Sequence, residues 1–211
     1  MKNCFAFAVV LSFTFVSLSF ADKGTSLQST LSKPGTQIVD EKFSDSQLGK
    51  TWSIGKGDWT VSNGTLVGKE KESDKHAAVL NLKHPNRNSV VQFSFKLDGA
   101  KTFHFSLNHA AGHLFRVVVN EKSLVVTKDK DKKDEKSKAI SLAKVDKQFE
   151  AGKWYSMLVA IDGERVEVVT DNDVHAQVSN PGLDVDKTGY RFVVNGESLQ
   201  ISDVKIWELQ K

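Results

Sequence analysis

The sequence predicts an all-β protein, built as a two-sheet antiparallel jelly-roll sandwich, and three observations carry this prediction. Short segments in which apolar and polar residues alternate recur along most of the chain, which is the pattern of strands with one buried face. No segment shows the periodicity of an amphipathic helix over three turns. Pairs that supply the positive φ of tight hairpin turns separate many of the segments: Asn63-Gly64, Asp98-Gly99, Asp162-Gly163 and Asn195-Gly196. Many short strands with regular turns favour a sandwich over a small barrel.

The expected strands follow one another in short steps. The clearest unit is a hairpin in which 58–62 and 65–67 flank Asn63-Gly64. In 89–97 the apolar residues Val91, Phe93, Phe95 and Leu97 alternate with polar ones, so this strand has one dry side. The complete set of expected strands is 37–43, 58–62, 65–67, 77–82, 89–97, 102–108, 112–120, 123–127, 153–161, 164–170, 174–178, 190–195 and 199–209. We expect the two terminal strands to pair in one sheet.

The N-terminus has the pattern of a secretory signal. Lys2 precedes an apolar run that ends at Phe20, and small residues frame a cleavage site after Ala21. A retained membrane anchor is the alternative, but the run is shorter than the roughly 18–20 residues of a membrane span. We therefore predict a signal peptide over 1–21 and an exported protein, either periplasmic or extracellular.

After the signal, the composition predicts a leader and then one domain. Residues 22–37 are rich in Ser, Thr, Gly and Lys and are expected to form a flexible leader. Residues 38–211 are expected to form a single jelly-roll domain, which is large enough to be stable through its core alone. The chain's one cysteine, Cys4, lies within the predicted signal, so the exported protein has no disulfide.

The overall charge excludes some classes of partner. The 29 basic and 26 acidic side chains give a formal net charge of +3, which argues against an electrostatic nucleic-acid binder. We expect a neutral partner, no membrane insertion after signal cleavage and no cofactor, and the sequence does not define an oligomeric state. The charged run 128–136 has nearly balanced signs and predicts a solvated loop. A calcium loop built on Asp129, Asp131 and Asp134 is the alternative, but it lacks the required glycine and final glutamate.

Polar residues that suit a carbohydrate site cluster in the middle of the chain. His104, Ser106 and Asn108 alternate with apolar residues in one expected strand, and His113 and Arg116 lie in the next. We place Lys96 on a neighbouring strand of the same sheet and add His76 to the set. Such groups donate and accept hydrogen bonds in fixed directions, as sugar hydroxyls require. The alternative is that they form the solvated side of an antiparallel sheet.

The tryptophans and carboxylates complete the search for a sugar site. Trp59 and Trp207 are interpreted as packing residues, whereas Trp52 and Trp154 are candidates for a rim that stacks on sugar rings. Residues 72–77 reproduce the first two acids of the Glu-x-Asp-x-x-Glu motif of laminarinase-like hydrolases but have alanine at the third, so we interpret the match as accidental. The chain has no nucleophile elbow. The spacings of His76, His104, His109 and His113 do not form a strong zinc signature.

Several short motifs, taken in order over 43–209, resemble a known family. They are Asp58-Trp59-Thr60-Val61, Asn63-Gly64-Thr65-Leu66-Val67-Gly68, Lys75-His76-Ala77-Ala78-Val79-Leu80, Phe93-Ser94-Phe95-Lys96-Leu97-Asp98-Gly99, Gly112-His113-Leu114-Phe115-Arg116-Val117, Gly152-Lys153-Trp154-Tyr155 and Val204-Lys205-Ile206-Trp207-Glu208. The sequence resembles secreted bacterial proteins of the concanavalin A-like lectin/glucanase fold, above all the 3-keto-disaccharide hydrolase-like family of planctomycete-type bacteria, formerly a domain of unknown function.

This resemblance implies a jelly roll whose concave sheet handles carbohydrate and, for some relatives, hydrolysis of oxidised disaccharides or glucosides. Arg116 and His76 carry over as candidate polar residues without a catalytic role. The chain departs from the family at 108–112, where Asn-His-Ala-Ala-Gly stands in place of an Asn-Ser-Gly stretch.

Two functions follow as hypotheses. The first is a secreted carbohydrate-binding or carbohydrate-processing protein, whose site is lined by His76, Lys96, His104, Asn108, His113 and Arg116. Its enzymatic form hydrolyses 3-keto-glycosides, with His104 or His76 as acid/base and Arg116 or Lys96 polarising the oxygen. The second is a non-catalytic envelope or extracellular interaction module, which predicts an exposed apolar patch and no pocket.

Overall fold

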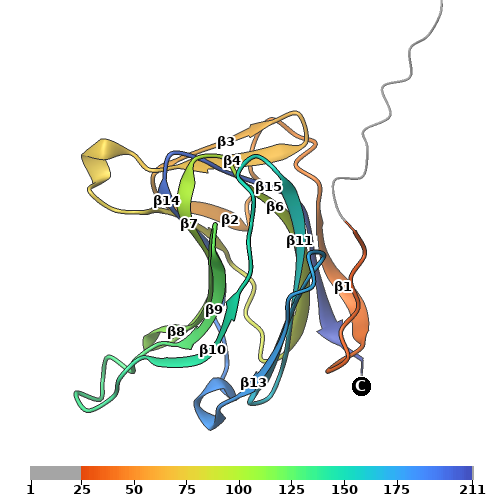
Figure 1. Cartoon of the computed structure of the whole chain (residues 1–211), viewed down its shortest axis with the longest axis vertical. Helices are drawn as coiled ribbons and strands as arrows, with labels where there is room; N and C mark the ends of the chain where they lie inside the picture. The colour runs from red at the N-terminus through yellow and green to blue at the C-terminus, as the bar shows by residue number, and fades with distance from the viewer. Residues whose placement is uncertain (1–24, 211) are drawn as a thin grey trace, which may run out of the picture.

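Residues 25–210, which the computed structural model describes, form two antiparallel sheets packed face to face (Figure 1). Sheet A is eight-stranded: β1 (Pro34–Glu41), β3 (Asp58–Ser62), β4 (Thr65–Lys69), β6 (Ser89–Leu97), β11 (Trp154–Asp162), β12 (Arg165–Thr170), β13 (His175–Ser179) and β15 (Leu199–Leu209). Sheet B is seven-stranded: β2 (Trp52–Lys56), β5 (Ala78–Leu82), β7 (Ala100–His109), β8 (Gly112–Asn120), β9 (Ser123–Lys128), β10 (Ile140–Asp146) and β14 (Gly189–Gly196). Two 3₁₀ turns, η1 (Glu72–Asp74) and η2 (Pro181–Leu183), complete the described elements. The predicted two-sheet jelly-roll sandwich is confirmed.

The strand order explains the shape of each layer. Sheet A runs β13-β12-β11-β6-β15-β4-β3, with β1 beside the second half of β15, and sheet B runs β10-β9-β8-β7-β14-β5-β2. Strands that are neighbours in the sequence therefore do not always pair: β6 and β7 are joined by a short turn but belong to different sheets. This crossing of layers decides which polar residues share a surface.

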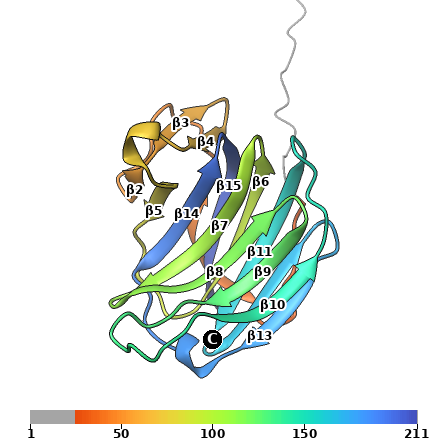
Figure 2. The ribbon, with the colours of Figure 1, turned by 60° about the vertical axis from the view of Figure 1, so that its left-hand side comes forward.

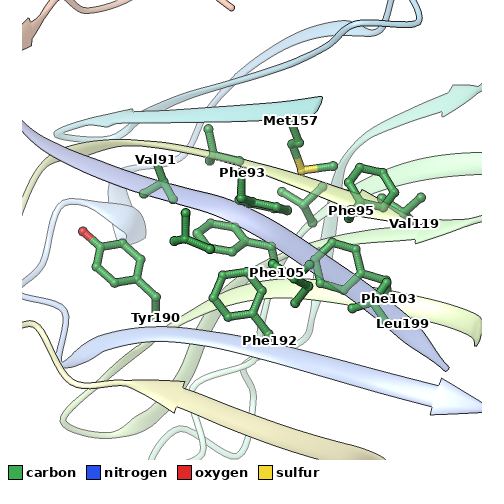
Figure 3. Packing of buried hydrophobic residues seen from close by; sticks show 14 of the residues in the cluster. Val91, Phe93, Phe95, Phe103, Phe105, Val119, Met157, Tyr190, Phe192 and Leu199 are labelled. Carbon is green, nitrogen blue, oxygen red and sulfur yellow. The ribbon is translucent and has the colours of Figure 1, made fainter. Parts of the chain in front are cut away.

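The core is built from the apolar side of the alternating pattern in both sheets. Phenylalanine rings dominate its centre, where Phe93 from β6 meets Phe103 and Phe105 from β7 and Phe192 from β14 (Figure 3). These four rings have exposed fractions of 1% or less. Each buried side chain of this size contributes roughly 1.5–3 kcal/mol relative to exposure. A domain without a disulfide in residues 25–210 is therefore stabilised by a continuous apolar core.

The expected Asn-Gly hairpin is confirmed. β3 and β4 pair in register around Asn63 and Gly64, whose φ angles are 51° and 67°, as a tight two-residue turn requires. Inside the hairpin, a Cβ atom at Gly68 would lie 2.3 Å from the Trp59 ring. Glycine is needed there because the indole packs directly on the backbone.

The expected pairing of the chain ends is also confirmed, since β1 pairs with β15. Two strands were not predicted. β2 contains Gly55 and a register shift beside it, and the edge strand β10 is largely exposed, so neither shows clean alternation. Both lie at the edges of sheet B, where only one neighbour shapes the sequence.

The prediction of a flexible leader up to residue 37 is wrong for the described part. Strand β1 begins at Pro34, and residues 25–32 lie on the outer side of sheet A, at the red end of the colour bar in Figure 1. Leu27 and Leu31 pack there on Val90 and Leu158, beside Ala160. The signal peptide predicted over 1–21 lies outside the described residues. Within 25–210 there is no helix of the length and apolarity that a membrane span needs.

Candidate functional site

The outer face of sheet B is the open surface of the sandwich. Figure 1 shows this sheet edge-on, curving inward between two projecting segments, the connection around η1 and the loop that follows β9. Figure 2 turns the same face toward the viewer, with β14, β7, β8 and β9 side by side across it. A curved sheet of this kind presents its polar side chains to one shared hollow.

One row of paired residues crosses this face from edge strand β2 to β9. Residues that pair directly in neighbouring antiparallel strands point to the same side of the sheet. At a strand spacing of 4.7–4.9 Å, the row is roughly 24 Å long. We call it the arginine row, and it consists of Ser53, Asn81, Arg191, Ser106, Arg116 and Thr127.

The two arginines of the row have different partners. Arg116 on β8 pairs with Asp129, which follows β9: Nε donates to Oδ2 at 2.9 Å, and Nη2 donates to Oδ1. Asp129 is only 8% exposed, so this two-bond pair is largely desolvated. The expectation that Asp129 belongs to a solvated loop is wrong. Asp129 directly follows β9, so its side chain still lies against the Arg116 guanidinium before the chain leaves the sheet as a loop.

Arg191 on β14 has a neutral partner instead. Its Nη1 lies 2.7 Å from Nδ1 of His113, and Asn108 Oδ1 lies 3.0 Å from the same nitrogen. A guanidinium only donates, so in this contact Nδ1 accepts and the imidazole carries its proton on Nε2; the Asn108 oxygen, which also accepts, then makes no hydrogen bond with Nδ1. Burial, together with the charges of Arg191 and Arg116, lowers the pKa of His113. His113 is therefore uncharged at neutral pH.

His104 lies at the centre of the next row, among valines. Its direct pairing partners are Val118 on β8 and Val193 on β14, which continues to Val79 on β5. Burial, with smaller contributions from Arg116 and Arg191, lowers the pKa of His104 to about 4. The only polar contact that the structure gives its ring within the described residues is Thr102 Oγ1, 3.3 Å from Nε2. This second row thus supplies apolar surface beside the arginine row.

A cleft of about 420 Å³ opens at the β2–β5–β14 side of the face. Part of the arginine row forms one wall of it, namely Ser53, Asn81 and Arg191, and Asn108 adds an amide. The volume lies within the range of small-ligand sites. Among the ten residues that line the cleft, none is a carboxylate and two, Lys83 and Arg191, are cations. The cleft therefore combines hydrogen-bonding groups with local positive charge.

The structure brings together four of the six predicted site residues: His104, Asn108, His113 and Arg116 all lie in β7 and β8 of sheet B. Whether they bind a ligand stays a prediction. Placing Lys96 on a neighbouring strand of this sheet was wrong, because β6 belongs to sheet A, where the Lys96 Nζ atom lies 5.3 Å from the Trp154 ring centroid. Apolar and polar residues alternate in the same way in the strands of either sheet, so the sequence did not show to which sheet β6 belongs.

His76 also stands apart from the other candidates. It is exposed in the connection between β4 and β5, and its Nδ1 contacts the carbonyl oxygen of Ala77. The adjoining acidic segment is structural, since Asp74 Oδ2 accepts a 2.7 Å hydrogen bond from the backbone N–H of Gly57. This explains the accidental match to a hydrolase motif: the two acids belong to a turn outside the sheet.

Sequence reasoning missed Arg191 and Asn81. Arg191 is a single polar residue inside the apolar strand β14, and Asn81 has the same position in β5. The signal was present, because a charged residue flanked by buried aromatics must point to the other face of its strand. Asn81, a polar residue between two buried leucines, pairs with Arg191 and so shares this surface, but only the topology shows that β5 and β14 are neighbours.

The tryptophans do not contribute to this face. Trp52 and Trp59 are each 7% exposed within the core, so the rim position considered for Trp52 is wrong. Trp154 and Trp207 lie in β11 and β15 of sheet A. Within residues 25–210, no group of three or more histidine, cysteine or acidic side chains is arranged to hold a metal ion. The site is therefore built from polar side chains and valines.

Comparisons with solved structures show which fold this is. The carbohydrate binding module CBM66 from Bacillus subtilis shares 10% identity at a TM-score of 0.62, over 75% of this chain and 96% of that one. Porphyranase B from Zobellia galactanivorans shares 11% at 0.62, over 82% and 91%. LamA from the same organism, in complex with laminaritriose and laminaritetraose, shares 12% at 0.61, over 83% and 100%.

No family model matches the sequence, and no curated protein matches it. At these identities the structural likenesses establish the fold alone. The chain has a concanavalin A-like jelly-roll fold.

Proposed function

We propose that this protein binds oligosaccharides across the outer face of sheet B, centred on Arg191, Asn108 and His113. The observation that carries the proposal is the arginine row beside the cleft of about 420 Å³, which presents hydroxyl, amide and guanidinium groups on one open surface. Sugar hydroxyls need such groups fixed in direction, and strands of a sheet fix them better than loops. A row roughly 24 Å long suits a chain of sugars rather than a single ring.

Structures of the same fold support this assignment by what their names state. One is a carbohydrate binding module, one is a porphyranase, and one is described with laminaritriose and laminaritetraose bound. The export signal predicted from the sequence supports the proposal, because an exported protein would meet extracellular glycans. Binding is favoured over hydrolysis, because neither the arginine row nor the lining of the cleft holds the two carboxylates that most glycoside hydrolases use.

A finer form of the proposal makes the ligand a 3-keto-glycoside that the protein hydrolyses. The resemblance of the sequence to the 3-keto-disaccharide hydrolase-like family supports it. A guanidinium such as Arg191 is a suitable donor to a keto oxygen, and His113, neutral with a free Nε2–H, is a suitable proton carrier. The alternative of an adhesion module has less support, since the large hydrophobic residues exposed in the described chain, Ile54 and Ile140, lie on opposite edge strands of sheet B.

One panel tests both forms. The wild-type protein is titrated calorimetrically with oligosaccharides and 3-keto-glucosides, and each mixture is then analysed by mass spectrometry. We expect binding that weakens about tenfold, or roughly 1.4 kcal/mol, in Asn81→Ala. The control variant Gln37→Ala, on the exposed part of β1, leaves affinity unchanged. New product masses support hydrolysis, and unchanged masses reject it. Absence of binding across the panel contradicts the proposed function.

A further inference from the structure

We propose that the saccharide bound by this face carries an anionic group, either a uronate carboxylate or a sulfate ester, and that this group pairs with the guanidinium of Arg191 at the cleft. This inference rests on the proposed function and names the class of sugar that the site takes. It differs from the neutral partner that the overall charge predicts, because the charge that matters is local.

Arg191 is a half-buried cation without a counter-ion among residues 25–210. In the described part of the chain no carboxylate forms an ion pair with it, and its hydrogen bond goes to the neutral imidazole of His113. Its Nε atom is buried and has no hydrogen-bond partner. Burying a charged donor without a partner costs free energy. An anion that contacts the Nη atoms at the cleft would offset the cost of the charge, while the buried Nε stays out of its reach.

Arg116, which occupies the same row on the other side of Ser106, differs from Arg191 in its partner. There the fold supplies its own carboxylate, Asp129, in a two-bond geometry. A guanidinium that already holds a carboxylate has little left to offer a ligand. The arginine row therefore contains one arginine that is paired with a carboxylate, Arg116, and one that has no carboxylate partner in the described structure, Arg191. Only Arg191 lines the cleft.

The charged residues that line the cleft are all basic. Lys83 and Arg191 line it, and no acidic residue is among the described residues of its wall. Burial and the nearby charge of Arg116 lower the pKa of Arg191 from its ordinary value, and the Asp129 carboxylate opposes this only in part. Guanidinium remains charged at all ordinary pH values. A carboxylate or sulfate matches its planar pair of donors.

The neighbouring side chains favour a sugar acid over a free inorganic anion. Ser53, Asn81 and Asn108 line the same cleft and offer neutral donors and acceptors. These groups suit the hydroxyls of a sugar ring that carries the anionic group. The proposal thus assigns the charge to Arg191 and the ring hydroxyls to the neutral residues around it.

The test uses matched pairs of ligands that differ only in charge. Trigalacturonate is compared with its methyl ester, and a κ-carrageenan tetrasaccharide with its desulfated form, by calorimetry at low and at high salt. We expect at least one acidic member to bind about tenfold or more tightly than its neutral match, with the difference reduced by salt. The arm in which this occurs identifies carboxylate or sulfate as the group.

Variants then assign the preference to Arg191. We expect Arg191→Gln to abolish the difference in affinity between the acidic and neutral members of each pair, and Arg191→Lys to retain part of that difference. Arg165→Gln, which removes an exposed positive charge from sheet A, serves as the matched control and leaves the preference intact. Thermal unfolding of each variant shows whether it is folded. If Arg191→Gln does not fold, Arg191→Lys still tests whether the acidic preference depends on this residue.

The outcomes separate the two proposals. Equal binding of the acidic and neutral members overturns the anionic inference and leaves the proposed function standing. Acidic preference that survives in Arg191→Gln also overturns it, because the charge is then recognised elsewhere. If no saccharide binds in either form, the proposed function fails.

Discussion

The two outer faces of the sandwich differ in whether the chain itself supplies partners for a buried charged group. On sheet A, Glu167 is fully buried and is surrounded by donors from the chain itself: Ser29, Thr30 and Leu31 from the N-terminal segment, and His175 and Gln177 from β13. On sheet B, Arg191 is half-buried beside an open cleft, and its Nε has no partner in the described structure.

The difference indicates which face is closed and which is available. Residues 25–32 cover the polar and apolar groups of sheet A, so that face is part of the folded interior. Among the residues described, no chain segment lies across the outer face of β14, β7 and β8 in the same way, as the view in Figure 2 shows. The chain itself supplies every partner of Glu167, whereas Arg191 has no counter-ion among the described residues, and the anionic ligand that we propose would provide one at the cleft.

The largest expected effect is on stability, from Glu167→Ala. The substitution removes the acceptor of several buried hydrogen bonds and leaves their donors unsatisfied, so the free energy of unfolding should fall by about 3–5 kcal/mol. Chemical denaturation measures it, and limited proteolysis should cut earlier within 25–32. The control Glu164→Ala, at an exposed site bonded to Ser179, should cost less than about 0.5 kcal/mol. Equal losses of unfolding free energy in the two variants would show that the packing of residues 25–32 on sheet A does not depend on Glu167.

The second effect is expected when Arg116 loses its carboxylate partner. Asp129→Asn removes the charge that holds Arg116, and we expect a stability loss of about 2 kcal/mol together with tighter binding of the acidic oligosaccharides. Denaturation and calorimetry measure the two quantities. Glu135→Gln, in the same loop, removes the same charge from an exposed position and is the control. Unchanged or weaker affinity in Asp129→Asn would contradict the idea that a free guanidinium on this face attracts the ligand.

The third effect is a pH dependence of the covered face. Burial acts to raise the pKa of Glu167, but hydrogen bonds from Ser29, Thr30, Gln177 and the Leu31 N–H outweigh it and lower the pKa to about 2. A depressed carboxylate pKa stabilises the fold above the ordinary value of 4.5 and loses that contribution as the pH falls toward 2. The stability advantage of the wild type over Glu167→Gln should therefore be constant above pH 5 and shrink below it. A difference that stays constant down to pH 2 would rule this out.

The smallest effect concerns the open face. Burial, with Arg116 and Arg191, lowers the pKa of His104 to about 4, so the unfolded chain takes up a proton near the ordinary value of 6.5 while the folded protein does not. Stability should fall as the pH drops from 6.5 toward 4, by about 1 kcal/mol from this residue at pH 6 and about 2 kcal/mol at pH 5. In His104→Gln, the difference between urea midpoints at pH 7.5 and pH 5 should be smaller than in the wild type. An equal difference in both proteins would mean that His104 already protonates in the folded state.

The sequence predicted the fold well because its signals are local. Alternation and the Asn63-Gly64 turn depend on neighbouring residues, and both were confirmed. The layer to which a strand belongs is not local, so Lys96 and His104 were assigned to one sheet although they lie in two. The order of residues 25–32 was missed for a similar reason: their composition is polar, but their partner Glu167 lies more than a hundred positions away.

The candidate site was predicted in part. His104, Asn108, His113 and Arg116 fall on one sheet, as expected from two consecutive alternating strands. Arg191 comes from a strand far along the chain, and its importance lies in a missing counter-ion, which only the three-dimensional arrangement reveals.

The most direct test of the central claim is to map where an oligosaccharide binds. Backbone amide chemical shifts of the isotope-labelled protein are followed during titration with the tightest-binding acidic oligosaccharide of the matched pairs. The account predicts shift changes concentrated in residues 81–83, 106–116 and 188–193, with residues 25–32 and 167–177 unaffected. Changes concentrated on sheet A and its N-terminal cover, with none around Arg191, would contradict it.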